Sequence, residues 1–249
     1  MHITLLYAAG AAVIALFGGA VAAVSGFGIG SVLTPFLAAS YGTKLAVAIV
    51  SVPHVIATAA RFITLRGAVN KKVFINFGIL SAAGGLAGAL ANVHVKSPAL
   101  AIAFGALLMF AGLSGLSGFV DRMRFGRRTA WFAGALSGFF GGLVGNQGGI
   151  RSAALLGFAI SKEAFVATAT AIGLIVDSAR MPVYFALESK AILSQWELLI
   201  ATIGGVLLGT FWGVRFLKRI PERMYRKLLY SLILALGVYM LIHGARGGA

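Results

Sequence analysis

The sequence contains no cysteine and very few acidic residues. Among its 249 residues there are 6 Asp and Glu against 21 Lys and Arg. The absence of cysteine excludes disulfides, thiolate metal ligands and cysteine nucleophiles. The chain also has no HExxH and no GxSxG sequence, so it lacks the zinc motif of metalloproteases and the nucleophile turn of serine hydrolases. We therefore predict that the protein is not an enzyme and holds no cofactor or metal.

Charged residues of either sign are scarce, at 11% of the chain, while apolar residues make up 59%. Soluble domains carry about 25% charged residues. With a mean hydropathy of +0.96, the sequence predicts an all-α polytopic membrane protein. The net charge of +15 would suggest nucleic acid in a soluble protein. Here the basic residues cluster at the ends of apolar segments, where they set topology and contact anionic lipid headgroups, so we predict no nucleic-acid partner.

Apolar segments of two lengths divide the chain. A helix needs about 20 residues to span a bilayer, and segments near that length cover residues 2–24, 45–65, 73–93, 99–120, 165–185, 198–216 and 225–242. Shorter segments cover residues 31–40, 131–144 and 150–160. Residues 2–24 have no basic start and no small-residue cleavage site, so we expect a retained span rather than a signal peptide.

Each half of the chain contains a glycine cluster just before a short apolar segment. The clusters read SGFGIGS over residues 25–31 and GGLVGNQGGIRS over residues 141–152. Irregular backbone at membrane depth is tolerated only where it is buried in protein or lines a cavity. An arginine there costs from about 3 to more than 10 kcal/mol, depending on the scale. Because the second cluster combines both features, it indicates a functional site.

A shift of 119 residues aligns the first glycine cluster with the second and Arg61 with Arg180. The distribution of basic residues predicts cytoplasmic loops after residues 65, 120 and 216, and external loops after residues 93 and 185. Corresponding loops of the two halves thus fall on opposite sides. We predict two inverted repeats, residues 1–120 and 121–249, each with a glycine-broken helical hairpin plus three transmembrane helices.

The two glycine clusters are predicted to meet near the middle of the bilayer and to bind a small oxyanion. Helix N-termini attract anions, glycines let the backbone approach a ligand, and an arginine fork suits oxyanions. The predicted substrate-binding residues are Ser25, Gly26, Gly28, Gly30, Ser31, Gly145, Asn146, Gln147, Gly148, Gly149, Arg151 and Ser152. In the competing interpretation, the glycines only permit tight packing and Arg151 snorkels to water.

Four further polar residues lie within the long segments and are candidates for the pathway or for coupling: His54, Arg61, Asp177 and Arg180. Asp177 and Arg180 are three residues apart on one helix, so they can pair. The pair is either structural, or Asp177 titrates and links proton movement to transport, with Arg180 and Arg61 lining the path. His54 has no evident partner in the sequence, and a satisfied buried histidine is favoured over a proton relay.

The two motifs SGFGIGSVLTPFL and GLVGNQGGIRSAALL, in a chain of this length and hydropathy, resemble the sulfite exporter TauE/SafE family over essentially the whole sequence. Members commonly have a proline after the glycine-rich motif in each half. Pro35 meets this pattern, whereas Ala154 stands at the matching position of the second half. The resemblance implies secondary transport of a small sulfur-containing anion, such as sulfite, thiosulfate or an organosulfonate, often outward across the bacterial inner membrane.

Two other functions stay open at the level of sequence. A passive small-anion channel would use the same site without proton coupling. A non-transporting membrane scaffold would explain the small-residue helix faces but not an arginine in a broken helix. The sequence does not define the anion, the direction, the coupling ion, whether the first segment spans fully, or whether the protein forms a homodimer.

Overall fold

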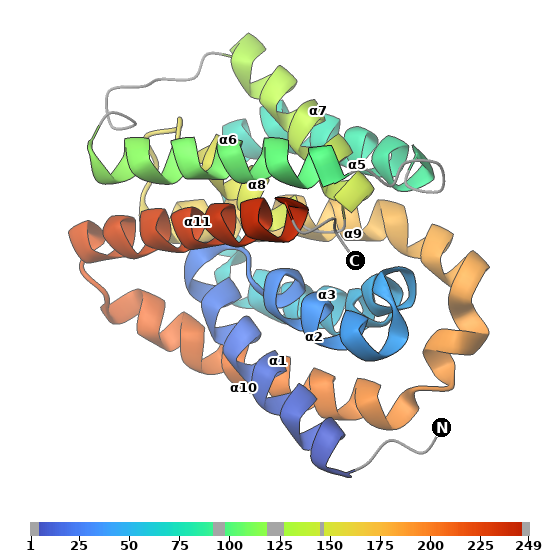
Figure 1. The fold of residues 1–249 in the computed structure, drawn as a ribbon. Helices are drawn as coiled ribbons and strands as arrows, with labels where there is room; N and C mark the ends of the chain where they lie inside the picture. Colours follow the sequence, from blue (N-terminus) through green and yellow to red (C-terminus); the bar gives the residue numbers. More distant parts are fainter. Residues whose placement is uncertain (1–4, 92–97, 119–126, 145–146, 246–249) are drawn as a thin grey trace.

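The computed structural model describes residues 5–91, 98–118, 127–144 and 147–245, and they form a bundle of helices (Figure 1). No strand occurs in these ranges. The first half contains α1 (Leu5–Ser25), α2 (Ile29–Tyr41), α3 (Thr43–Leu65), a 3-10 turn η1 (Arg66–Ala68), α4 (Lys71–Val73), a π-helical segment η2 (Phe74–Gly78), α5 (Ile79–Ala91) and α6 (Pro98–Leu116). The second half contains α7 (Arg127–Val144), α8 (Gln147–Leu155), α9 (Lys162–Leu193), α10 (Trp196–Arg219) and α11 (Glu222–Ala245).

Helices end at both glycine clusters. α1 ends at Ser25 and α2 begins at Ile29, and between them Gly26 and Gly28 have φ angles of 79° and 142°. Glycine adopts such angles without the steric cost that a Cβ would bring. In the second half α7 ends and α8 begins on either side of residues 145–146, which lie outside the described residues.

Two segments differ from the ranges that hydropathy predicts. The segment expected as one uniform helix over residues 73–93 contains the π-helical turn η2 between α4 and α5. The second short helix was expected over residues 150–160, but α8 already ends at Leu155. Glycine is a poor helix former, and Gly157 follows two residues later. Ser161 then accepts a hydrogen bond from the Ala164 backbone and caps the start of α9.

α9 is longer than predicted, because it continues from residue 185 to Leu193. Its 32 residues correspond to a length of about 48 Å at 1.5 Å per residue, which exceeds a hydrocarbon core of about 30 Å. Pro182 lies inside it, and a proline removes a helical hydrogen bond and favours a bend. Figure 1 shows the ribbon of α9 changing direction before it reaches α10.

Helices of the first half pack against helices of the second half. α1 lies along α10, α5 along α7, α6 along α11, and α3 crosses α9. Glycines permit the close approach: a Cβ on Gly209 would overlap the Leu16 carbonyl, and one on Gly84 would overlap the Ala135 carbonyl. Gly84, one of several small residues spaced for close helix packing on this segment, therefore lies at the contact of α5 with α7.

Two sets of contacts define which helix ends lie together. At the start of α10, the Tyr41 hydroxyl donates to Gln195 Oε1 at 3.0 Å. At its far end, the Lys162 ammonium donates to the Ile220 carbonyl, and the Lys162 backbone donates to Glu222 Oε2 at 3.3 Å. The end of α2 and the start of α9 therefore lie near opposite ends of α10.

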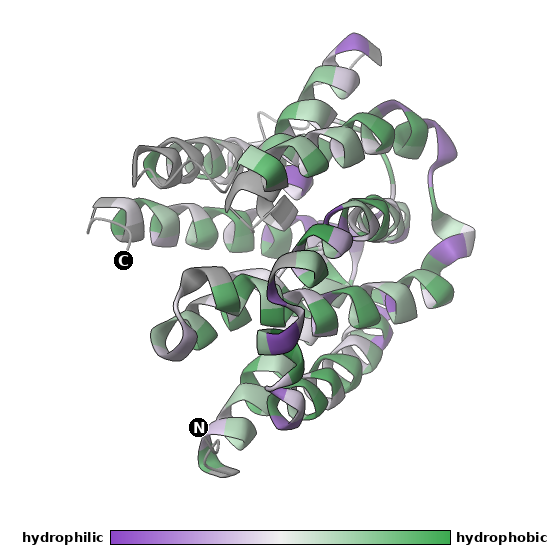
Figure 2. Ribbon diagram, turned by 90° about the vertical axis from the view of Figure 1, so that its right-hand side faces the viewer, coloured by the Kyte–Doolittle hydropathy of each residue, from purple (hydrophilic) through white to green (hydrophobic). Residues whose placement is uncertain are grey.

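The outer surface is apolar over most of the helices. Among the described residues, five helices are long and apolar enough to cross a membrane: α1, α3, α9, α10 and α11. Figure 2 shows hydrophobic colour along most ribbons, with hydrophilic residues gathered largely at helix ends and turns. Large side chains such as Phe17, Phe132 and Trp212 are exposed on the surface, as lipid contact requires. The prediction of an all-α, multi-pass membrane protein is confirmed.

Candidate functional site

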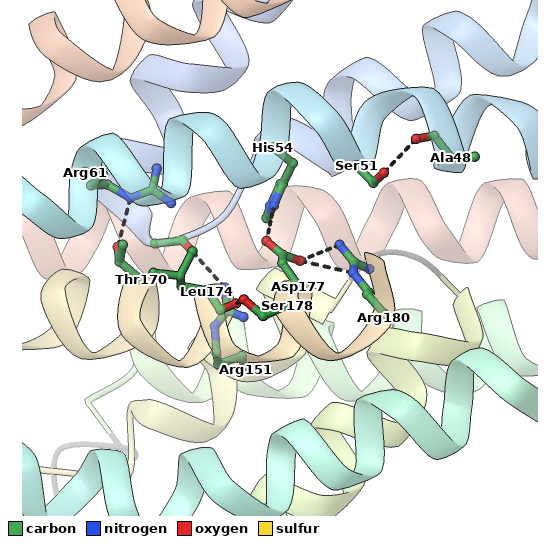
Figure 3. Close-up of polar contacts among 11 residues, drawn as sticks. Ala48, Ser51, His54, Arg61, Arg151, Thr170, Leu174, Asp177, Ser178 and Arg180 are labelled. Carbon is green, nitrogen blue, oxygen red and sulfur yellow. Dashed lines mark hydrogen bonds and ion pairs between the residues drawn. The ribbon is translucent and has the colours of Figure 1, made fainter. Parts of the chain in front are cut away.

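Buried polar side chains gather where α3 crosses α9 (Figure 3). His54 Nδ1 lies 2.7 Å from Asp177 Oδ2, and Arg61 Nε donates to Thr170 Oγ1 at 2.8 Å. The later residue on α3 thus meets the earlier residue on α9, so the two helices run antiparallel at this crossing. Residues 170, 177 and 180 share one face of α9 because they are spaced by three and seven positions.

Asp177 holds two partners at once. Its Oδ1 accepts from Arg180 Nε at 3.0 Å and lies 2.8 Å from Arg180 Nη2, while its Oδ2 faces His54. Asp177 as a whole is 1% exposed. The pairing of Asp177 with Arg180 expected from their spacing is present, and His54 has in Asp177 the partner that the sequence did not reveal.

The helix that follows the second glycine break, α8, touches the first break, although the two are more than 100 residues apart in the chain. Arg151 Nη2 donates to the Gly26 carbonyl at 3.2 Å, and the Ser152 hydroxyl donates to the Ser25 carbonyl at 3.2 Å. Both serines are fully buried. α8 thus donates two hydrogen bonds to the backbone of the first break, where regular helical hydrogen bonding is interrupted.

The structure places the remaining predicted binding residues around this contact. Gly28 lies in the first break, Gly30 and Ser31 in the first turn of α2, and Gln147, Gly148 and Gly149 in the first turn of α8. Gly145 and Asn146 lie outside the described residues. A Cβ on Gly148 would overlap the Phe27 side chain, so the start of α8 lies against the first break. Backbone N–H groups in a first helical turn have no intrahelical acceptor.

Arg151 is enclosed by protein, at 2% exposure. The interpretation in which it snorkels to water is therefore wrong. Its guanidinium lies over Gly173 of α9, where a Cβ would stand 3.3 Å from both terminal nitrogens. Arg151 Nε and Nη1 have no hydrogen-bond partner among the described residues, and a buried donor without a partner is costly.

Two more buried arginines have a nitrogen without a hydrogen-bond partner among the described residues. Arg61 and Arg180 are 1% and 4% exposed, and each has a buried Nη1 without a hydrogen-bond partner in the part of the chain that is described. Across the same part, Asp177 is the one acidic side chain that is buried. The buried cluster of Arg61, Arg151, Asp177 and Arg180 therefore has hydrogen-bond donors without acceptors and an excess of positive charge. Such an arrangement suits an anion.

Sequence reasoning missed Thr170 and Gly173 on α9. Thr170 is the hydrogen-bond partner of Arg61, and Gly173 makes room for the Arg151 guanidinium. Threonine and glycine are both common in membrane helices, so neither gave a signal. Once Asp177 was a candidate, its helical face at spacings of three, four and seven residues could have directed attention to both.

A model of the sulfite exporter TauE/SafE family matches residues 11–240. No curated protein and no solved structure matches the chain. The matched range includes both glycine breaks and the whole crossing of α3 with α9. The chain therefore belongs to the sulfite exporter TauE/SafE family, whose members are membrane transporters of sulfur-containing anions and not enzymes.

Proposed function

We propose that the protein is a secondary transporter that exports sulfite, thiosulfate or an organosulfonate across the bacterial inner membrane, coupled to protons. The anion binds where the two glycine breaks meet, held by Arg151 and by first-turn N–H groups of α2 and α8. One observation carries the proposal: the guanidinium of Arg151 is buried at this junction, and two of its nitrogens have no partner among the described residues.

The arrangement of helices supports two inverted repeats. The first hairpin, α1 and α2, ends at Tyr41, which contacts the start of α10. The second hairpin, α7 and α8, is followed by Lys162, which contacts the end of α10. The hairpins thus return toward opposite ends of the same helix, while α8 of the second hairpin touches the break of the first. Such hairpins enter the membrane from opposite faces and meet inside it.

The pairing of helices between the halves supports the same repeat. α1 packs on α10 and its counterpart α7 packs on α5, the counterpart of α10. α3 and α9 correspond to each other and cross antiparallel, as equivalent helices of inverted repeats must. Rocking of one repeat against the other would then expose the junction to each side in turn.

Proton coupling is assigned to the pair His54 and Asp177. They lie 2.7 Å apart, and Asp177 also holds Arg180. A proton that binds this pair weakens the hold of Asp177 on Arg180 and frees its guanidinium for the anion. Arg61 lines the same crossing through its bond to Thr170. Proton binding and anion binding would then favour one another, so that the anion and the proton would cross the membrane together, in the same direction.

Flux in proteoliposomes tests the proposal. Vesicles loaded with sulfite, with a membrane-impermeant reporter outside, should release it faster when they contain the protein, and a proton gradient should change the rate. Arg151→Gln should abolish this release while the protein still folds. Arg215→Gln is the matched control, because Arg215 is exposed on α10 and stacks on Phe211 at 3.6 Å; it should transport normally.

The alternatives give different results in the same assay. A passive channel shows flux that follows the anion gradient and does not respond to an imposed proton gradient. A scaffold shows no flux above that of empty vesicles. Full transport by Arg151→Gln would contradict the assignment of the binding site, whichever transport mode the wild type has.

A further inference from the structure

We propose that the junction selects anions by their charge and binds divalent oxyanions in preference to monovalent ones of the same shape. The inference rests on the proposed function and deepens it, because it divides the candidate substrates. Sulfite and thiosulfate carry two negative charges when fully ionised, whereas a simple organosulfonate carries one.

The charge of the buried cluster is the basis of this inference. Arg61, Arg151 and Arg180 bring three positive charges, and Asp177 brings one negative charge. Together these four groups have a net charge of +2. No other buried acidic side chain occurs in the described part of the chain to reduce this excess.

The excess is distributed over donors that face no protein acceptor. Each of the three arginines has its Nη1 buried and without a partner among the described residues, and Arg151 adds its Nε. The three arginines lie along the same stretch of α9 (Figure 3): Arg61 donates to Thr170, Arg151 lies over Gly173, and Arg180 pairs with Asp177. An anion bound at Arg151 would therefore be attracted by the charge of all three arginines.

Burial makes the number of ligand charges matter. Two unit charges about 4 Å apart interact several times more strongly in a protein environment than in water, and an unpaired buried charge is costly. A divalent anion brings the described cluster to neutrality. A monovalent anion leaves one buried positive charge without compensation, so it should bind more weakly even though dehydrating it is easier.

Two tetrahedral anions of different charge show the effect of charge on affinity while the shape of the anion stays the same. Sulfate and perchlorate each present four oxygens, but sulfate is divalent and perchlorate is monovalent. Isothermal titration of the purified protein at constant ionic strength should give a dissociation constant for sulfate at least about 10-fold lower than for perchlorate. Thiosulfate against methanesulfonate provides a second pair, in which both members contain sulfur.

Charge variants test the cause of the preference. Arg61→Gln lowers the net charge of the cluster by one and can still donate to Thr170, so the ratio of the two constants should fall toward one. Arg61→Lys keeps the charge and should keep the ratio, while Arg215→Gln removes an exposed charge and should leave it unchanged. Equal binding of sulfate and perchlorate by the wild type, or an unchanged ratio in Arg61→Gln, would overturn the proposal.

These binding experiments distinguish failure of the charge preference from failure of the proposed binding site. If neither anion of either pair binds, the site assignment and this inference both fail. If anions bind and Arg151→Gln abolishes binding, but valence has no effect, the site stands and the selection by charge is wrong. Should Arg61→Gln not fold, the wild-type ratios for the two pairs alone decide between these results.

Discussion

Replacing Asp177 by asparagine removes the single buried negative charge from a group of buried arginines. Arg180 then loses the acceptor that its Nε and Nη2 contact at 3.0 and 2.8 Å, and His54 loses its partner at 2.7 Å. Removal of one member of a buried ion pair typically costs about 3–5 kcal/mol, because the other charge stays buried without compensation. We expect Asp177→Asn to lower the free energy of unfolding by about this amount.

The assay is reversible unfolding in detergent, followed by helical circular dichroism, for the wild type, Asp177→Asn, Arg180→Gln and the double variant. The two residues contact each other, so their effects should not add. The double variant should be more stable than the sum of the single effects by about 1–3 kcal/mol. Asp177→Glu, which retains the charge, should lose less than Asp177→Asn.

Two results would refute this reasoning. One is a cost below about 1 kcal/mol for Asp177→Asn, a value typical of an exposed ion pair. The other is strict additivity in the double variant, which would mean that Asp177 and Arg180 do not stabilise each other in the folded protein.

Three further predictions concern the breaks, the packing and the coupling. Gly26→Ala should cost about 1–2 kcal/mol for a residue held at positive φ and reduce transport, because its Cβ would also stand 2.9 Å from Ala169 Cβ; normal flux would contradict this. Gly138→Ala should destabilise the protein by about 1–3 kcal/mol through overpacking of α7 on α5, whereas Gly67→Ala, in open space, should not change the unfolding midpoint. Finally, Asp177→Asn should alter the pH dependence of flux in proteoliposomes, and an unchanged profile would discard its coupling role.

Much of the fold was predictable from hydropathy and glycine placement. The interruption at Gly26 and Gly28 follows from the residue type, because a glycine cluster between apolar segments has few other uses at membrane depth. The π-helical turn at Phe74–Gly78 and the continuation of α9 to Leu193 were not predictable. Both depend on packing against neighbouring helices, which does not leave a periodic pattern in a uniformly apolar sequence.

The candidate site, like the fold, could be predicted from the sequence only in part. Arg151 and Asp177 could be identified as candidates from the sequence, because a charged residue at membrane depth is costly and usually has a function. Their partners could not be identified, because hydrogen bonds to Gly26 and His54 join residues 125 and 123 positions away. Pairing over such separations leaves no local pattern in the sequence. The role in substrate binding stays a prediction for all of the residues assigned to it, and Gly145 and Asn146 also lie outside the described residues.

The central claim is that an anion sits between the two glycine breaks, and a direct measurement is anomalous diffraction from crystals soaked in selenate, a tetrahedral divalent oxyanion. The account predicts a selenium peak within hydrogen-bond distance of the Arg151 guanidinium and close to the first turns of α2 and α8, absent in Arg151→Gln crystals. Selenium bound only at exposed cations such as Arg215, with nothing at the junction in the wild type, would contradict it.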